Sequence, residues 1–227
     1  MHYAIRPRSR LAETDVAHIL SGFADDRTAS EVSAAGGVSV RTVNDYFQQI
    51  RRYLAVEQRL ALAALRERAL LPMPVHSPAS ADAFGLVMHA GELFVEALPQ
   101  RVARVLRAGR KERPEDGSAE PAKGEREQEA FAGMWNTYLG LLDARCCHVV
   151  QGPWLRAHRL DDPEARRISG ELDVFQQMAA ARFRRFYGIH HHTLALHVYE
   201  SAFRFSQRQR QLMPALLERF SERPLWE

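Results

Sequence analysis

Residues 39–52, SVRTVNDYFQQIRR, carry side chains of the types that read DNA bases. If the stretch is a helix, Arg41 can form two hydrogen bonds to guanine, and Asn44 or Gln48 can form two to adenine. Arginines about a turn later are suited to phosphate contacts. The predicted DNA-binding residues are Ser39, Val40, Arg41, Thr42, Asn44 and Gln48, followed by the phosphate contacts Arg51 and Arg52.

Residues of metal-binding and catalytic types also occur, but their spacing does not favour a site. The side chains of the histidine run 190–192 point in different directions. Cys146 and Cys147 are expected to be unbonded thiols in a reducing compartment, because sequence neighbours rarely form a disulfide. The acidic cluster 161–164 contains a proline and indicates a surface turn, and Asp116 lies in a segment without apolar periodicity. We therefore predict no metal ion and no cofactor.

Three helices are expected to position residues 39–52. Thr14 can cap the first helix, and TASE at 28–31 is a capping-box pattern for the second, which ends at the Gly36-Gly37 pair. Ser39 caps the third. The apolar positions at helical spacing are Val16, Ile19, Leu20 and Phe23 in the first helix, and Val43, Tyr46, Phe47 and Ile50 in the third.

Helices in this order, with Ser33 at the crossing and Gly37 in the turn, are typical of a helix-turn-helix DNA-binding unit. The alternative is a three-helix unit that binds protein. Asp45 counts slightly against DNA, because phosphates repel a carboxylate unless it accepts a hydrogen bond from cytosine.

The composition indicates a globular protein with a sizeable core. The chain has 227 residues, of which 46% are hydrophobic and 26% charged, and its formal net charge is +3. Arginine supplies nearly all the positive charge, a bias that suits phosphate contacts but also marks GC-rich genomes. No apolar run approaches the length of a membrane span, and the first residues lack the apolar core of a signal peptide. We expect a bacterial cytoplasmic, nucleoid-associated protein with no membrane partner.

The remainder of the chain predicts strands followed by helices. A helical run and a proline-containing loop form a linker over 56–82, and AFGLVMHAGELFVEAL indicates a hairpin. RVARVLRA should be helical, residues 109–130 a mobile loop, and RCCHVVQ a strand. The pattern is helical from Leu172 onward. The expected class is α+β, with a first domain over 1–55 and a second over 83–227.

Three segments, in the correct order, resemble one family. FRRFYGIHHHTLALHVYESAFRFSQR (183–208) resembles the C-terminal signature of bacterial insertion-sequence transposases of the DDE class, ISXO branch. AFGLVMHAGELFVEALP is similar to their second and third core strands, and the N-terminal helices resemble their helix-turn-helix. With gaps, the resemblance extends from about Phe23 to Phe220.

The resemblance implies a reduced RNase H-like α/β domain with a helical C-terminal end, in which three carboxylates hold two divalent metal ions. The first acid has no counterpart on a strand before AFGLV. The position of the second falls on Gly133, and Asp173 takes the place of the third, a glutamate. One carboxylate cannot hold two metal ions in a fixed geometry. Asp173 is therefore a vestigial candidate, and we expect no catalytic residues.

The resemblance and the missing acids together favour a sequence-specific DNA-binding protein derived from a transposase. The expected role is a transcriptional regulator that binds double-stranded DNA, as a homodimer, with the transposase-like domain as scaffold for dimerisation or for a protein partner such as the transcription machinery. Arg182, Arg184 and Arg185 could add a second DNA-contacting surface. Two alternatives stay open: an active transposase or nuclease with relocated acids, and an interaction module that has lost DNA binding.

Overall fold

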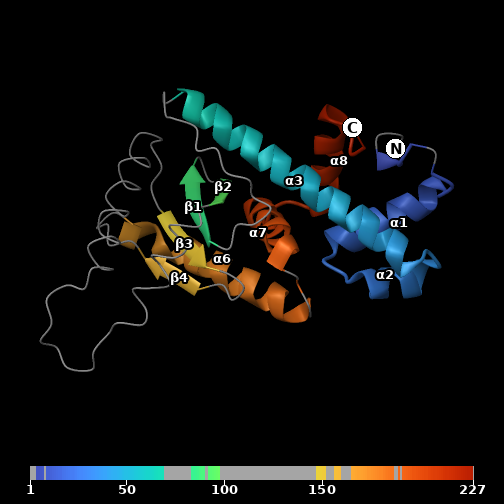
Figure 1. Cartoon of the computed structure of the whole chain (residues 1–227), viewed down its shortest axis with the longest axis horizontal. Helices are drawn as coiled ribbons and strands as arrows, with labels where there is room; N and C mark the ends of the chain where they lie inside the picture. Colours follow the sequence, from blue (N-terminus) through green and yellow to red (C-terminus); the bar gives the residue numbers. More distant parts are fainter. Residues whose placement is uncertain are drawn as a thin grey trace, which may run out of the picture. The chain divides into compact units, whose positions relative to one another are not determined.

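The chain forms two compact units in its computed structural model (Figure 1). The first combines Met1–Glu57 with Phe203–Glu227, and the second is Gln58–Ala202. The structure describes residues 4–7, 9–68, 83–89, 92–97, 147–151, 156–159, 165–186, 189 and 191–226. Helices and antiparallel strands both occur there, so the predicted α+β class is confirmed in this coarse form. The predicted domains at 1–55 and 83–227 differ from these units, because the C-terminal residues pack with the N-terminal helices.

The first unit contains α1 (Glu13–Ala24), α2 (Ala29–Gly36), the start of α3 (Val40–Arg68) and α8 (Leu212–Glu222). Figure 1 shows α3 as one unbroken helix, so the helical run predicted after Leu54 continues the third helix.

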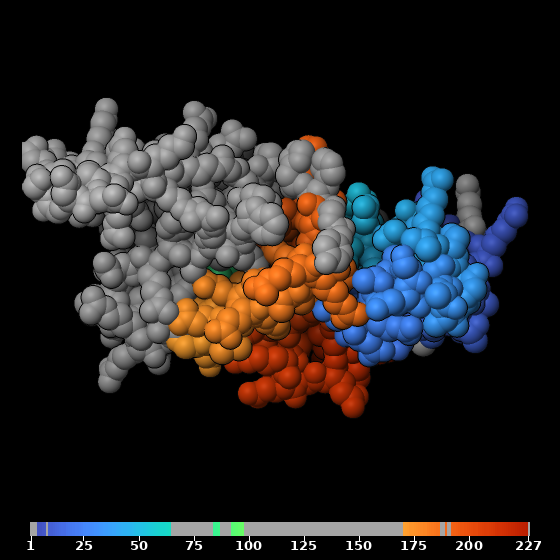
Figure 2. All heavy atoms as spheres, turned by 90° about the horizontal axis from the view of Figure 1, so that it is seen from below, coloured from blue at the N-terminus to red at the C-terminus, as the bar shows by residue number. Residues whose placement is uncertain are grey.

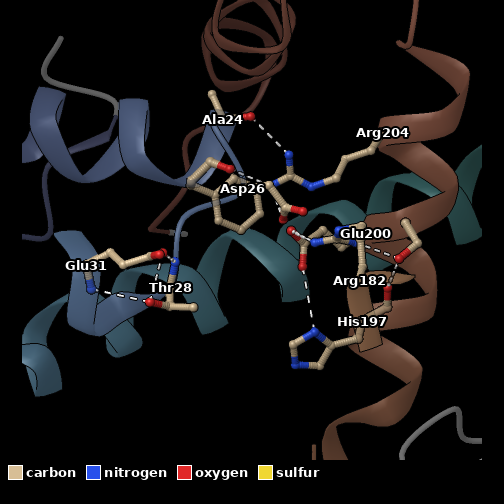
Figure 3. Close-up of polar contacts among 10 residues, drawn as sticks. Ala24, Asp26, Thr28, Glu31, Arg182, His197, Glu200 and Arg204 are labelled. Carbon is tan, nitrogen blue, oxygen red and sulfur yellow. Dashed lines mark hydrogen bonds and ion pairs between the residues drawn. The ribbon is translucent and has the colours of Figure 1, made fainter. Parts of the chain in front are cut away.

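The helix starts follow local capping. The Thr28 N–H donates to the Glu31 carboxylate at 2.6 Å, and the Glu31 N–H donates back to the Thr28 hydroxyl at 3.3 Å, which confirms the predicted capping box (Figure 3). The prediction that Thr14 caps α1 is wrong. The N-cap is Ala12, whose N–H donates to the Asp15 carboxylate at 3.2 Å, and Thr14 lies inside the helix.

The core of the first unit is built from both ends of the chain. All eight apolar positions predicted in the first and third helices are buried, each at most 2% exposed. Phe203, Leu216, Phe220 and Leu225 complete the same cluster. Two glycines make room where α1 and α2 pack together: an added Cβ would come within 2.3 Å of Val32 Cγ2 at Gly22 and within 2.3 Å of the His18 ring at Gly36.

Polar contacts of Arg204 and Tyr53 help to tie the C-terminal residues to the N-terminal helices. Arg204, from α7 (His191–Ser206), donates to the carbonyl oxygens of Phe23 and Ala24 at the end of α1 and lies 3.6 Å from the Asp26 carboxylate (Figure 3). The Tyr53 hydroxyl of α3 donates to the Arg219 carbonyl oxygen of α8 at 2.5 Å. Both side chains donate to backbone carbonyl oxygens in the last turn of a helix, adding to the backbone hydrogen bonds that Phe23 and Arg219 accept there.

The strands of the second unit form an antiparallel sheet with the order β2-β1-β3-β4. β1 (Ala83–His89) and β2 (Glu92–Ala97) form the predicted hairpin, and β3 (Cys147–Gln151) confirms the RCCHVVQ strand. β4 (Arg156–Arg159) was not predicted. β1 pairs with β2 on one edge and with β3 on the other, so no further strand can pair with it.

The helices towards the C-terminal end differ from their predicted bounds. α6 (Ala165–Arg185) begins seven residues before Leu172. The helical pattern at the C-terminal end is interrupted at 207–211, which separates α7 from α8.

A buried polar cluster joins α6 to α7 within the second unit. Arg182 donates to Glu200 and to the Ser201 hydroxyl, each at 2.6 Å, and the Ser201 hydroxyl donates to the His197 carbonyl oxygen at 2.8 Å (Figure 3). Because Arg182 is 7% exposed, it is a packing residue, and the prediction that it adds to a DNA-contacting surface is wrong. Arg184 and Arg185 are exposed.

Several predictions concern residues outside the described ranges. They are the RVARVLRA helix, the mobile loop at 109–130, and the positions of Asp116, Gly133, Cys146, residues 161–164 and His190. Within the ranges that the structure describes, no helix combines the length and the apolar character needed to cross a membrane.

Candidate nucleic-acid interface

The turn between α2 and α3 depends on a glycine. Gly37 has φ 71°, in the left-handed region that glycine adopts without steric cost, and its N–H donates to the Ser33 carbonyl oxygen at 3.1 Å. Val38 follows and is 7% exposed, which anchors the turn to the core. The turn between α2 and α3 therefore lies at Gly37, as predicted.

Ser39 caps α3 as predicted. Its Oγ accepts from the Thr42 N–H at 3.1 Å and lies 2.8 Å from the Thr42 hydroxyl. The first turn of α3 contains no acidic residue, so no carboxylate neutralises the positive end of the helix dipole there. This helix end is electrostatically suited to an anion.

The start of α3 presents most of the predicted side chains to solvent. Figure 2 shows α1, α2 and the start of α3 as a contiguous blue surface. Thr42 is half-buried. The exposed members of the predicted set are Ser39, Val40, Arg41, Asn44, Gln48 and Arg52.

The opposite face of the same helix is fixed in the core. Val43 and Ile50 are fully buried, and the Phe47 ring meets the Phe23 ring edge-on with centroids 5.2 Å apart. Burial on one face sets the rotation of α3 about its axis, so the exposed face is presented in one orientation.

Arg51 is the exception among the predicted residues. Its side chain is buried, with the guanidinium 5.8 Å from the Phe23 ring centroid and 5.7 Å from that of Phe47. A guanidinium held over two aromatic rings in this way stabilises the junction of α1 and α3. The structure therefore gives Arg51 a packing role, and Arg52 alone of the two is presented to solvent.

An open cleft of about 510 Å³ borders this face and was not predicted. Its charged residues are Arg6, Arg10 and Asp45. The arginines belong to the segment before α1, whose sequence RPRSR at 6–10 is the signal that could have indicated them. Its other lining residues are Pro7, Ser9, Leu11, Thr42, Tyr46 and Trp226.

The residues considered for metal or catalytic chemistry do not assemble in the described part of the chain. Asp173 lies on α6 and is half-buried. No group of three histidine, cysteine or acidic side chains there could hold a metal ion. The described side chains thus provide no place for the two-metal chemistry that the resemblance implies.

Comparisons with protein-family models, with curated protein sequences and with solved structures find no match to this chain.

Proposed function

We propose that the chain is a sequence-specific DNA-binding protein that inserts the start of α3 into the major groove, with α2, the turn at Gly37 and α3 as a helix-turn-helix. One observation carries the proposal. The first three turns of α3 expose side chains that hydrogen-bond to bases, while the opposite face of the helix is locked in a core. A rigid helix with an exposed polar face at its N-terminal end is the arrangement used by helix-turn-helix readers.

Within this proposal the residues divide by role. Arg41, Asn44 and Gln48 recur at the spacing that places them on one helix face, and they read base edges. Phosphate is bound at the N-terminal end of the helix, whose dipole no carboxylate neutralises, by the backbone together with Ser39 and Thr42. Arg52 binds a further phosphate about three turns later. Val40, a 41% exposed apolar side chain, is suited to contact a thymine methyl group.

Binding-site selection with a random duplex library tests the proposal. The full chain should enrich a defined sequence, and its affinity should fall steeply with added salt. The double variant Arg41→Ala, Asn44→Ala should lose the preference for that sequence while its circular dichroism is unchanged. A loss of about 1–3 kcal/mol is expected for each bidentate base contact removed.

Arg59→Ala is the matched control, because it removes an exposed arginine from the same helix at a distance from its N-terminal end. It should retain the selected sequence. A wild-type chain that enriches no sequence and binds no duplex at low salt would refute the proposal and favour a protein-binding unit.

We further propose that the chain derives from a transposase, acts as a homodimeric transcriptional regulator and does not cut DNA. The β1–β2 hairpin and the helices that follow the sheet support an RNase H-like second unit. The pairing of β3 with the other edge of β1 counts against it, because that edge is where the family's first core strand is expected. Palindromic selected sequences would support the dimer. Metal-dependent cleavage abolished by Asp173→Ala would overturn the non-catalytic proposal.

A further inference from the structure

The segment before α1 is held beside the start of α3 by specific contacts. We call residues 4–7 and 9–11 the N-terminal arm. Ala4 is fully buried, and its carbonyl oxygen accepts from Trp226 Nε1 at 3.0 Å. The Arg6 N–H donates to the Tyr46 hydroxyl of α3 at 3.3 Å. Because both hydrogen bonds hold the backbone of the arm, the arm has a defined course beside the start of α3.

The arm brings two guanidinium groups to one side of the exposed face of α3. Arg6 and Arg10 line the same cleft as Thr42 and Asp45. Thr42 and Asp45 lie one and four residues after Arg41, so the cleft flanks the face that carries the proposed base-reading side chains.

The charge of this cleft is positive. Arg6 and Arg10 are both exposed, and neither forms an ion pair with a carboxylate among the described residues. Asp45 is the single carboxylate that lines the cleft among its described residues. The Arg6 guanidinium lies 5.5 Å from the Trp226 ring centroid, a stacking contact that limits the rotamers it can adopt. A partly ordered guanidinium loses less conformational entropy when it binds an anion.

The geometry of duplex DNA identifies the anion. An α-helix with its side chains is about 10–12 Å across, and the major groove is about 12 Å wide. A helix in the groove therefore has a sugar-phosphate backbone along each flank. Arginine forms bidentate, charge-assisted hydrogen bonds with phosphate oxygens.

We propose that Arg6 and Arg10 bind the phosphodiester backbone along one wall of the groove that α3 enters. This inference rests on the proposed function and adds to it a second contact, made by the arm. The arm fixes the position of α3 in the groove and contributes affinity that does not depend on base sequence.

Titration of fluorescent duplexes with the full-length chain at several salt concentrations tests the inference. Arg10→Ala should weaken binding to the selected and to unrelated duplexes by a similar factor. It should also lower the salt slope of log K by about one, and leave the selected sequence unchanged. Arg10→Lys, which keeps the charge, should retain the slope. Arg6→Ala should act in the same direction, and Arg59→Ala again serves as the exposed-arginine control.

The outcomes separate the two proposals. If the wild-type chain binds no duplex, the proposed function fails, and this inference fails with it. If the wild-type chain selects a sequence but Arg6→Ala and Arg10→Ala bind with unchanged affinity and salt slope, the helix reads DNA without the arm and only this inference is overturned. Unchanged urea unfolding of both variants should establish that the arm substitutions do not act through the fold.

Discussion

The left-handed backbone conformation of Gly37 forms the turn that leads into the proposed DNA-reading helix, α3. A Cβ at this position would meet no atom within 4 Å, so a substitution there tests the left-handed backbone alone. We expect Gly37→Ala to lower the free energy of unfolding by about 1–2 kcal/mol, since an L-residue disfavours φ 71°. Gly37→Asn should cost less, because asparagine tolerates this region. Urea denaturation measures both.

Gly170 provides the control for this substitution. It lies in α6, and a Cβ there also meets nothing within 4 Å, but the residue is helical. Gly170→Ala should therefore stabilise the protein by about 0.5–1 kcal/mol. Equal effects of the two alanine substitutions would show that the left-handed turn does not constrain the chain.

Exposure of individual residues on α3 could largely be predicted from sequence, because helical period decides which positions share a face. The predicted buried positions Val43 and Ile50 are buried, and Arg41 and Asn44 are exposed. The burial of Arg51 was not predicted, because it depends on the Phe23 ring of another helix. The spacing of residues within one helix does not show which side chains of other helices will pack against them.

At the scale of elements, the packing of α8 on α3 is concentrated around Tyr53. Its ring meets the Phe220 ring edge-on at 5.1 Å, and the Arg223 guanidinium lies 4.5 Å from its centroid. Arg223 also forms an ion pair with Glu57 at 3.0 Å. Burial raises the pKa of Tyr53 to about 12, and the Glu57 carboxylate adds a smaller part of this rise. The guanidinium groups of Arg223 and Arg219 lower the pKa and so oppose the rise.

This raised pKa predicts a loss of stability at high pH. Between pH 10 and about 12 the unfolded chain releases the Tyr53 proton and the folded chain retains it, so rising pH favours unfolding. The contribution of Tyr53 is complete below pH 10 and is lost as the pH passes the folded-state pKa. Absorbance at about 295 nm, the usual band of tyrosinate, should show a late-titrating tyrosine that is missing in Tyr53→Phe.

Comparison of Tyr53→Phe with the wild-type chain in urea gives the second measurement. The variant should lose less stability between pH 10 and 12, although removal of the hydroxyl that bonds to Arg219 lowers its stability at neutral pH by about 1 kcal/mol. A parallel fall of both proteins over this range would contradict the assignment.

Sequence predicted the existence of elements better than their continuity. The hairpin at Ala83–Ala97 follows from two β-type runs around HAG, and the capping box at Thr28 is local. The interruption at 207–211 has one local mark, Pro214 in the first turn of α8, because a proline is tolerated at a helix start but not inside a continuous helix. β4 is too short for a period to be recognised. The pairing of β1 with β3, and therefore which strands lie at the edges of the sheet, depends on residues far apart in sequence, which a local pattern does not specify.

At the scale of the whole molecule, the first unit is completed by residues that follow the second unit in sequence. Phe220 is fully buried in the same core as the N-terminal helices. We expect Phe220→Ala to destabilise the first unit by about 3–5 kcal/mol, as usual for a buried aromatic ring. Hydrogen exchange should become faster in α1 and α2 as well as in α8, because the three helices share this core.

Val56→Ala is the matched control, since Val56 lies on α3 with 40% of its side chain exposed. Its effect should stay within about 0.5 kcal/mol. If Phe220→Ala accelerates exchange in α8 alone, the N-terminal helices are stable without the C-terminal residues.

The domain division could not be predicted from the sequence, because composition changes along the chain mark linkers and not long-range packing. The prediction at 83–227 assigned the C-terminal helix to the nearest preceding elements. Contacts such as the hydrogen bond of Tyr53 to Arg219 of α8, separated by 166 positions, assign it to the first unit instead. Such contacts follow from the folded geometry, which a local pattern does not contain.

The closure of the first unit by Phe203–Trp226 has a consequence for synthesis of the protein. Domains usually fold in order as the ribosome releases them, N-terminal first. Here α1, α2 and the start of α3 emerge early, yet their core lacks Leu216 and Phe220 until the second unit has been translated. A premature stop codon or a frameshift after residue 202 would therefore leave the core around α1, α2 and the start of α3 incomplete. We expect such truncated chains to be less stable than the full chain, so the first unit becomes complete only after the second has been translated.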